Sequence, residues 1–478
     1  MSIPSFNQSY IGGKFVASHG TQVIDLVNPA TNGVIGKVTL ADQVDARNAI
    51  AAAKKAFRAF SQTTREERMD YLQRLHDAVS RRMEDLVAAT VLEYGAPQER
   101  ARGSNNLAAN IFLHFKQVLA EFDFATTAGR SRVVFEPLGV VGVFTPWNSS
   151  AGSIAIKVAP ALAAGCTVVV KPSEMSAMQT QVLMEAFHEA GLPPGVVNFV
   201  AGLGEVVGTE LTSSPDVRKI AFTGSTPIGK LVARNSLETM KRFTLELGGK
   251  SPNIILDDAD FTKAIPMAVN ACFLNNGQAC IAASRLFVPE DRLDEVKRLI
   301  KATVDNIKVG DPTDKDVTIG PSASRKQYAR VQEYIRSGIE EGAELVVGGE
   351  GHPAGLEQGN FVKPTVFANV TPAMRIAREE IFGPVLSVLA YKTEAEAIEM
   401  ANDSEYGLMA YVSSSNAERA YRVARQLDAG RVLINTLSHD PLTPFGGFKQ
   451  SGIGREGGIF GLKEFLEPKA IIEDAIPA

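Results

Sequence analysis

The stretch GVVGVFTPWN at residues 139–148 decides the fold, because an apolar, β-branched run ends there in a loop that carries an aromatic and an amide side chain. A segment with helical spacing follows, and the alternation repeats as far as residue 235. The candidate strands are residues 140–145, 167–170, 196–200 and 219–222, and the candidate helices are 154–164, 177–190, 205–212 and 228–235. This alternation predicts a parallel sheet covered by helices, with ligands at the carboxyl ends of its strands.

The same rhythm returns more weakly after Cys280. The candidate strands there are 285–288, 344–347, 385–391 and 431–434, and the candidate helices are 293–307, 326–341 and 394–402. We interpret them as a second α/β domain, so the segment before Cys280 lies between two domains, where small-molecule sites commonly form.

The N-terminal quarter is predicted to be helical after a short β-rich start. Apolar residues recur at helical spacing between positions 46 and 60. A second helix begins with the capping-box pair Thr64 and Glu67, its apolar stripe runs from Met69 to Leu86, and Gly95 is a plausible C-cap. Both apolar stripes are interpreted as helix faces that pack in the core.

Composition sets the broad class. The 478 residues exceed what one hydrophobic core usually serves, so two or three domains are expected. A net charge of −5 without a basic stripe argues against a nucleic-acid partner. Three cysteines argue against a disulfide framework and for a reducing compartment. The start resembles no signal peptide, and the longest apolar run is too short to span a bilayer, so a cytoplasmic protein without a membrane partner is expected.

Cys280 is the most informative single residue, because it closes the polar, glycine-containing run 275–280. A cysteine in such a turn is either a buried small hydrophobe or a reactive group whose surroundings favour the thiolate. Upstream, Glu246 precedes a glycine pair and could supply a base for the thiol. Cys166 and Cys272 lie in apolar stretches and are interpreted as structural.

Two other strand ends carry unusual loops. Lys171 and Glu174 follow the second strand and could donate to phosphate and accept from a ribose diol, or form a solvated pair. The loop after the fourth strand nearly matches a P-loop, but Leu231 stands where a magnesium-binding hydroxyl is required, so an NTPase is rejected. The better interpretation is a glycine turn that opens a helix with Pro227 in its first turn, whose N-terminus can face a pyrophosphate. The usual dinucleotide fingerprint G-x-G-x-x-G is absent here.

Seven segments, in this order, resemble the aldehyde dehydrogenase superfamily over nearly the whole chain. They are residues 145–148, 171–174, 222–225, 246–250, 277–280, 379–384 and 444–451. The resemblance implies an α/β fold with two Rossmann-like α/β domains, one cofactor-binding and one catalytic, plus a small β oligomerisation flap. The implied NAD-binding domain is 1–118 with 139–247, the catalytic domain is 248–448, and the flap is 119–138 with 460–478. A homodimer or homotetramer is expected.

The resemblance implies NAD(P)+-dependent oxidation of an aldehyde to its carboxylic acid. Cys280 would attack the aldehyde carbon to form a thiohemiacetal, and the Asn148 amide with the Cys280 backbone N–H would form the oxyanion hole. After hydride loss, Glu246 would activate the water that hydrolyses the thioester. None of the six histidines has metal-ligand spacing, and no metal is expected.

The resemblance also implies the cofactor contacts. Lys171 and Glu174 would contact the adenosine ribose, Glu380 the nicotinamide ribose, and Phe382 the nicotinamide ring. Glu174 would repel a 2′-phosphate, which favours NAD and leaves NADP possible. The full implied set is Thr145, Pro146, Trp147, Lys171, Ser173, Glu174, Gly204, Gly224, Ser225, Gly229, Leu247, Gly248, Gln327, Glu380 and Phe382.

The implied substrate pocket departs from the family pattern. Ser149 and Ser150 stand where relatives often place a bulky aromatic, which indicates a smaller, more polar wall. His439 and Asp440 could accept a polar or ring-bearing substrate, or could belong to a solvated loop. With the Asp-Pro pair they resemble a branch of bacterial oxo-acid and aromatic semialdehyde dehydrogenases. The implied pocket residues are Ser149, Ala279, Ile281, His439, Asp440 and Phe445.

Two alternatives share the fold. A coenzyme A-acylating semialdehyde dehydrogenase commonly lacks the water-activating glutamate, so the presence of Glu246 argues against it. A catalytically silent binding protein would be expected to lose Cys280, Glu246 or Asn148, and all three are present.

Overall fold

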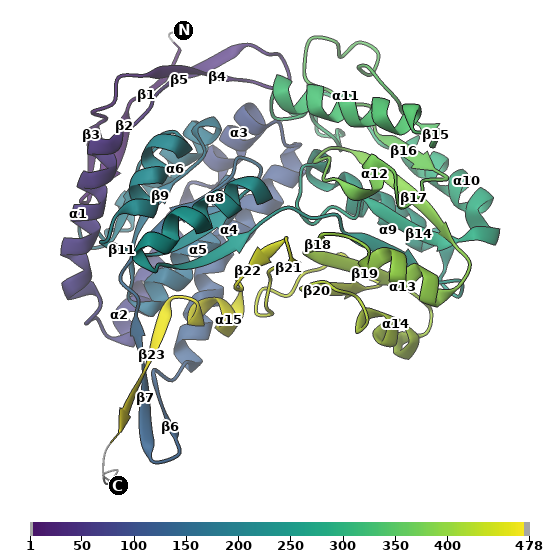
Figure 1. Ribbon diagram of the computed structural model, residues 1–478. Helices are drawn as coiled ribbons and strands as arrows, with labels where there is room; N and C mark the ends of the chain where they lie inside the picture. Colours follow the sequence, from purple (N-terminus) through teal and green to yellow (C-terminus); the bar gives the residue numbers. More distant parts are fainter. Residues whose placement is uncertain (1–2, 473–478) are drawn as a thin grey trace.

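The computed structural model describes residues 3–472 and contains two α/β lobes, each built on one large sheet (Figure 1). The first sheet has eight strands in the order β22-β12-β11-β8-β9-β10-β2-β3. Its central five strands are parallel, and β2, β3 and β22 are antiparallel at the edges. The strands are β2 (Gln8–Ile11), β3 (Lys14–Ala17), β8 (Val140–Phe144), β9 (Thr167–Lys171), β10 (Val197–Phe199), β11 (Val217–Thr223), β12 (Arg242–Glu246) and β22 (Gly452–Ile453).

Helices cover both faces of this sheet, as the alternation predicts. Val141 and Val143 of β8 point into one core with α2, α4, α5 and α6, whereas Val140 and Phe144 point into the other with α1 and α7. This division follows from the two-residue period of a strand. The helices are α1 (Gln43–Phe60), α2 (Arg65–Arg81), α4 (Gln98–Glu121), α5 (Ser150–Ala164), α6 (Ala177–Glu189), α7 (Thr209–Ser213) and α8 (Thr226–Ser236).

The second sheet has seven strands in the order β15-β16-β17-β14-β13-β19-β20, and only β15 pairs antiparallel. Helices α9 and α10 cover one face, and α11, α13 and α14 cover the other. The strands are β13 (Pro252–Ile255), β14 (Arg285–Pro289), β15 (Glu344–Val347), β16 (Thr365–Ala368), β17 (Val385–Tyr391), β19 (Met409–Ser413) and β20 (Arg431–Ile434). The helices are α9 (Phe261–Phe273), α10 (Leu293–Val304), α11 (Arg325–Glu340), α12 (Arg375–Arg378), α13 (Glu394–Asn402) and α14 (Ala417–Ala424).

Several expected helices are shorter or divided. The single helix expected from Thr64 through Leu86 is two, α2 and α3 (Met83–Tyr94), because the chain leaves helical geometry at Arg82 (φ −95°, ψ 15°). Gly95 ends α3 with a φ of 81°, as its C-cap assignment predicts. The helix expected over 205–212 is a wider turn, η2 (Gly204–Gly208), followed by α7, and the one expected over 293–307 ends at Val304.

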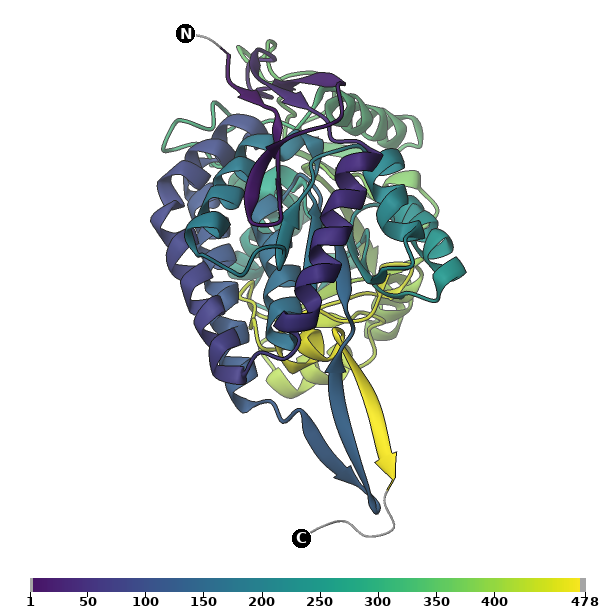
Figure 2. The same ribbon diagram turned by 90° about the vertical axis from the view of Figure 1, so that its left-hand side faces the viewer.

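Three small sheets complete the architecture. One contains β1 (Ser5–Phe6), β5 (Val34–Thr39) and β4 (Val23–Val27), and another pairs β18 (Tyr406–Gly407) with β21 (Phe448–Lys449). The third, in the order β23-β7-β6, projects from the body (Figures 1 and 2). Its strands are β6 (Ala125–Ala128), β7 (Ser131–Pro137) and β23 (Leu466–Ile472), which follows α15 (Gly458–Lys463).

The third sheet lies within the segments expected to form a flap, 119–138 and 460–478, although residues 473–478 and residues 1–2 lie outside the described part. Within residues 3–472, no helix combines the length and the apolarity needed to cross a bilayer.

Candidate active site

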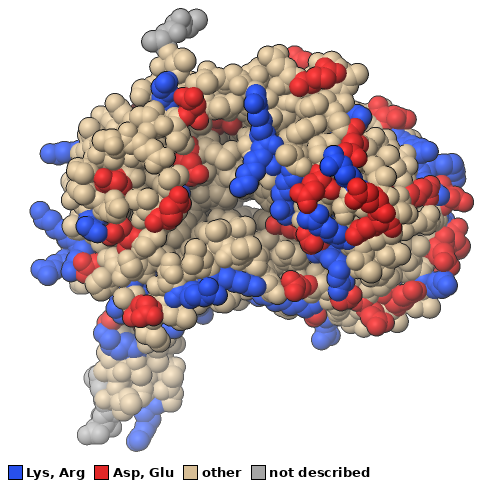
Figure 3. All heavy atoms as spheres, turned by 45° about the horizontal axis from the view of Figure 1, so that its top comes forward, with Lys and Arg blue, Asp and Glu red and all other residues tan. Residues whose placement is uncertain are grey.

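The carboxyl ends of the parallel strands of the first sheet meet at one edge. Phe144 of β8 is in register with Lys171 of β9, and Thr223 of β11 with Glu246 of β12. The chain crosses from this sheet to the second between Glu246 and Pro252, where β13 begins. The loops singled out from the sequence therefore open toward the space between the lobes, and the molecular surface is hollowed there (Figure 3).

Cys280 follows a tight turn with unusual backbone geometry. Asn275, Asn276 and Gly277 all have positive φ, at 57°, 60° and 69°. A Cβ on Gly277 would lie 2.2 Å from the carbonyl carbon of Gly383, so only glycine fits this turn.

Glycine is also required beside the cysteine itself. A Cβ on Gly249 would lie 2.4 Å from the carbonyl oxygen of Cys280. The second glycine of the pair after Glu246 therefore lets the chain pass directly against the Cys280 backbone.

The protonation state of Cys280 differs from the sequence expectation. Cys280 is partly exposed, but desolvation raises the pKa of its thiol to about 12, and the carboxylates of Glu380 and Glu246 add to the shift. A hydrogen bond from the backbone N–H of Cys280 lowers the pKa of this thiol. The surroundings thus favour the thiol rather than the thiolate, so a reaction at this sulfur needs a base to take its proton.

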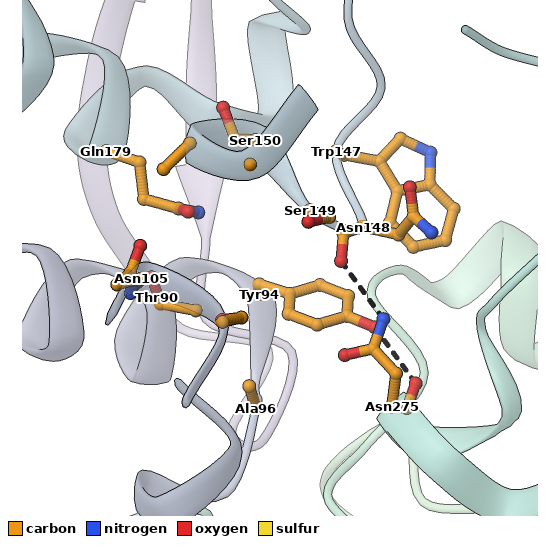
Figure 4. A pocket seen from close by; sticks show the side chains of 13 residues that line it. Thr90, Tyr94, Ala96, Asn105, Trp147, Asn148, Ser149, Ser150, Gln179 and Asn275 are labelled. Atoms are coloured by element: carbon orange, nitrogen blue, oxygen red, sulfur yellow. Dashed lines mark hydrogen bonds between the residues drawn. The ribbon is translucent and has the colours of Figure 1, made fainter. Parts of the chain in front are cut away.

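Asn148 is held next to Cys280 by an amide network. Asn275 Nδ2 donates to the carbonyl oxygen of Asn148 (Figure 4). Asn148 Nδ2 donates to the carbonyl oxygen of Gln278 at 2.9 Å, and Asn275 Nδ2 donates to the same oxygen. The fully buried Gln278 side chain accepts from the Ala323 N–H at 2.9 Å and donates to the Tyr94 hydroxyl at 3.3 Å. The Asn148 side chain is therefore held against the backbone of Gln278, two residues before Cys280.

Glu246 is a buried carboxylate with free acceptor capacity. Within residues 3–472, neither of its oxygens has a hydrogen-bond partner. Burial raises the pKa of Glu246 well above its usual range, the Glu456 carboxylate raises it further, and Lys157 and Arg455 lower it. A Cβ on Gly446 would lie 2.9 Å from Glu246 Oε1, so the glycine-rich 444–451 segment closes over the carboxylate.

Two charged residues at this site were missed by sequence reasoning. Lys157 in α5 is fully buried, and its Nζ donates to Thr223 Oγ1 at 2.5 Å and to Glu456 Oε1 at 2.6 Å. The available signal was that Lys157 is the only charged residue in the apolar helix 154–164. Because a buried lysine needs a partner, this position pointed to an acid elsewhere in the chain.

The residues expected to hold the ribose and ring of a dinucleotide lie in two groups. Near β9, Lys171 Nζ lies 3.7 Å from Glu174 and donates to the Pro172 carbonyl at 2.9 Å. A cavity of about 470 Å³ lies between the lobes and is lined by Glu174 and Ser324 among others.

The second group lies beside the Cys280 turn. The rings of Trp147 and Phe382 are perpendicular with centroids 5.5 Å apart, and Gln327 Nε2 donates to the Phe382 carbonyl at 2.8 Å. Glu380 accepts from the Gly249 N–H at 3.0 Å, and burial raises the pKa of Glu380. The sequence elements thus converge from both lobes.

The remaining positions expected to contact the cofactor lie around these groups. Ser225 is the N-cap of α8, and Gly229 lets α8 approach Leu247, because a Cβ there would lie 2.4 Å from the Leu247 side chain. Apart from Gly229, which lies within α8, these positions share a place at the ends of β8, β9, β11 and β12 or in the turn after β10. They are Thr145, Pro146, Ser173, Gly204, Gly224, Ser225, Gly229, Leu247 and Gly248. Buried donors and acceptors at strand ends, with a glycine-opened helix N-terminus, fit a dinucleotide.

The structure brings only some of the expected substrate-pocket residues close together. Ile281, which follows Ala279 and Cys280, packs in one apolar cluster with Phe445. Ser149 lines a cavity of about 10 Å³ with Asn148 and Trp147, which is roughly room for one water molecule (Figure 4).

The two polar residues of the 437–443 loop face different neighbours. His439 Nδ1 lies 3.2 Å from Arg431 Nη1, whereas Asp440 accepts from the Leu442 N–H at 2.9 Å. Both side chains are exposed, so the loop combines local hydrogen bonds with a solvated surface.

Comparisons with known proteins agree with this geometry. The model of the aldehyde dehydrogenase family matches residues 15–471. A 3-succinoylsemialdehyde-pyridine dehydrogenase from Pseudomonas sp is 46% identical over 469 residues, 98% of each chain. A mutant of aldehyde dehydrogenase C from Pseudomonas syringae, solved with NAD+ and octanal, is 46% identical, with a TM-score of 0.96 over 98% of this chain and 96% of that one. A betaine aldehyde dehydrogenase from Staphylococcus aureus with NAD+ is 37% identical, with a TM-score of 0.94 over 99% and 95%.

Proposed function

This chain belongs to the aldehyde dehydrogenase family and is an oxidoreductase that acts on aldehydes, and we propose that Cys280, Glu246 and Asn148 carry its reaction. The reaction is the NAD(P)+-dependent oxidation of an aldehyde to its carboxylic acid through a cysteine intermediate and water. The observation that carries the assignment of roles is that these three residues, far apart in sequence, lie around one backbone turn.

Cys280 Sγ attacks the aldehyde carbon after losing its proton. Because desolvation raises the pKa of the thiol, deprotonation requires a base, and the Glu246 carboxylate raises that pKa further, which places it near the sulfur. The oxygen of the thiohemiacetal is stabilised by Asn148 Nδ2 and the Cys280 N–H. Such a donor typically contributes about 10²–10³ in kcat.

Bound NAD+ supplies the hydride acceptor. Glu380 and Gln327 would hold its nicotinamide side and Lys171 with Glu174 its adenosine ribose. The carboxylate of Glu174 favours NAD+ over NADP+, because a 2′-phosphate would meet a like charge.

Glu246 then takes a proton from the water that hydrolyses the Cys280 thioester. A base is most effective when its pKa is near the working pH, and burial moves the pKa of Glu246 in that direction. Because this base activates water, the product is a free carboxylic acid rather than a coenzyme A ester. The buried carboxylate without a protein partner supports hydrolysis over the acylating alternative.

The remaining assignments concern organisation. We assign the cofactor-binding domain to 1–118 and 139–247, the catalytic domain to 248–448 and the flap to 119–138 and 460–478. The projecting sheet supports a homodimer or homotetramer, since within residues 3–472 β23 pairs with β7 alone and leaves an edge for a second copy. A cytoplasmic location is supported by the three cysteines, all of which are free.

The test is NADH production across a panel of aldehydes, with C280A as the inactive control. We expect the wild type to reduce NAD+ with at least one aldehyde and C280A with none. A wild type that produced neither NADH nor NADPH with any aldehyde would overturn the proposed function.

A further inference from the structure

Arg100 is a cation without a counter-ion beside the active-site turn. It lies in the first turn of α4, and within residues 3–472 it makes no hydrogen bond or ion pair. Its Nε is buried, and burial lowers the pKa of the guanidinium. Burying a charge without a partner costs free energy, so an arginine kept in this setting suits a site that receives an anion.

A large cavity lies against Arg100. Its volume is about 600 Å³, and its walls are mostly apolar, with Pro97, Phe273, Leu274, Leu299 and Ile307 among them. Asn275 also lines it, and the same residue lines the small cavity beside Asn148. The cavity therefore adjoins the turn that carries Cys280, and it is large enough for an aliphatic chain or a ring.

The loop after β20 carries His439, an exposed residue whose imidazole contacts Arg431. Desolvation lowers the pKa of His439, and the positive charges of Arg431 and Arg100 lower it further. A neutral His439 accepts from Arg431 Nη1 at Nδ1, so its proton is on Nε2.

Arg431 is held in place by backbone carbonyl oxygens of the same loop. It donates to the carbonyl oxygens of Thr443 and Pro444, and its guanidinium lies over the Phe445 ring at 5.3 Å. The nearby Asp440 acts electrostatically on Arg431 and on His114. An arginine stays charged at physiological pH, so the corner at Arg100 keeps its positive charge.

We propose that Arg100, which lines this cavity, binds a carboxylate at the end of the substrate remote from the aldehyde. The preferred substrates are then oxo acids with an apolar spacer between the two groups. This inference rests on the proposed aldehyde oxidation and adds the substrate class. A planar guanidinium suits this role, because two of its five N–H groups can donate in parallel to the two oxygens of a carboxylate.

The test compares a linear ω-oxo carboxylic acid with its methyl ester, which lacks the remote charge and carries one additional methyl group. We expect the wild type to have a higher kcat/KM for the acid. In R100M the acid-to-ester ratio of kcat/KM should fall by about 10- to 100-fold, mainly through KM, because a bond to a charged group is lost. R102M is the matched control, since Arg102 lies on the exposed side of α4 and pairs with Glu84, and its ratio should equal that of the wild type.

The outcomes separate the two proposals. A wild type that uses aldehydes without preferring the acid, or an R100M ratio equal to that of the wild type, overturns the carboxylate subsite and leaves the aldehyde dehydrogenase function standing. Absence of turnover with every aldehyde overturns the function and this inference together. The wild-type comparison needs no variant, so it decides the question even where R100M is unstable.

Discussion

The Nζ of Lys157 lies 2.6 Å from Glu456 Oε1, and both residues act electrostatically on the buried carboxylate of Glu246, the proposed base. Glu456 raises the pKa of Glu246, and Lys157 lowers it. The pair joins α5 to a segment 299 residues later in the chain. It therefore sets the proton affinity of the base without touching the reacting carbon.

Lys157 and Glu456 are predicted to shift the pH profile in opposite directions. The base form of Glu246 is lost as the pH falls through its raised pKa, so the rate of thioester hydrolysis falls on the acid side. K157M removes the cation and should move this acid limb to higher pH. E456Q removes the like charge and should move it to lower pH, each by about one pH unit or more. The measurement is the steady-state rate against pH, and shifts of the same sign would contradict the model.

E246Q is predicted to separate the two halves of the reaction. Glutamine preserves the shape of the side chain but cannot accept the proton of the hydrolytic water. We expect one NADH per site in a burst, followed by a steady-state rate that is lower by about 10²–10⁴. Stopped-flow absorbance at 340 nm, roughly the NADH band, measures both phases. The burst rate reports whether Glu246 also deprotonates Cys280, and a wild-type steady-state rate would remove Glu246 from the mechanism.

G249A is predicted to damage catalysis more than stability. The new Cβ would lie 2.4 Å from the Cys280 carbonyl oxygen, closer than protein atoms approach, so the nucleophile must move. A displacement of about 1 Å can cost about 10²-fold in rate, and we expect a loss of that size in kcat/KM. G103A is the control, because a Cβ there meets no atom within 4 Å and alanine favours helix. Equal activities of the two variants would show that Gly249 is not required.

E174Q is predicted to relax the choice of cofactor. Removing the carboxylate next to Lys171 removes its repulsion of a 2′-phosphate and leaves the cation in place. The ratio of kcat/KM for NADP+ to that for NAD+ should rise by roughly tenfold, which corresponds to about 1.4 kcal/mol. E189Q is the control, because Glu189 pairs with Arg82 at the end of α6. An unchanged ratio in E174Q would assign cofactor choice to other residues.

Much of the fold could be predicted because the buried strands are continuous apolar runs. The expected strands at 140–145, 167–170 and 219–222 match β8, β9 and β11 closely. Strand β12 was missed because Arg242–Glu246 begins and ends with charges and has no uninterrupted apolar run. The break at Arg82 was missed because the apolar stripe runs through it, and a hydrophobic period does not record a local change of φ and ψ.

The sequence by itself determined the alternation of strands and helices and singled out the candidate reactive side chains, because apolar periodicity and glycine turns are local properties of the chain. Only the tertiary structure decided how those side chains behave. The partnership of Lys157 with Glu456, the unpaired guanidinium of Arg100 and the raised pKa of the Cys280 thiol all depend on atoms from distant segments. Desolvation and electrostatic interaction act through space, so the proton affinities at this site are set by what the fold places nearby.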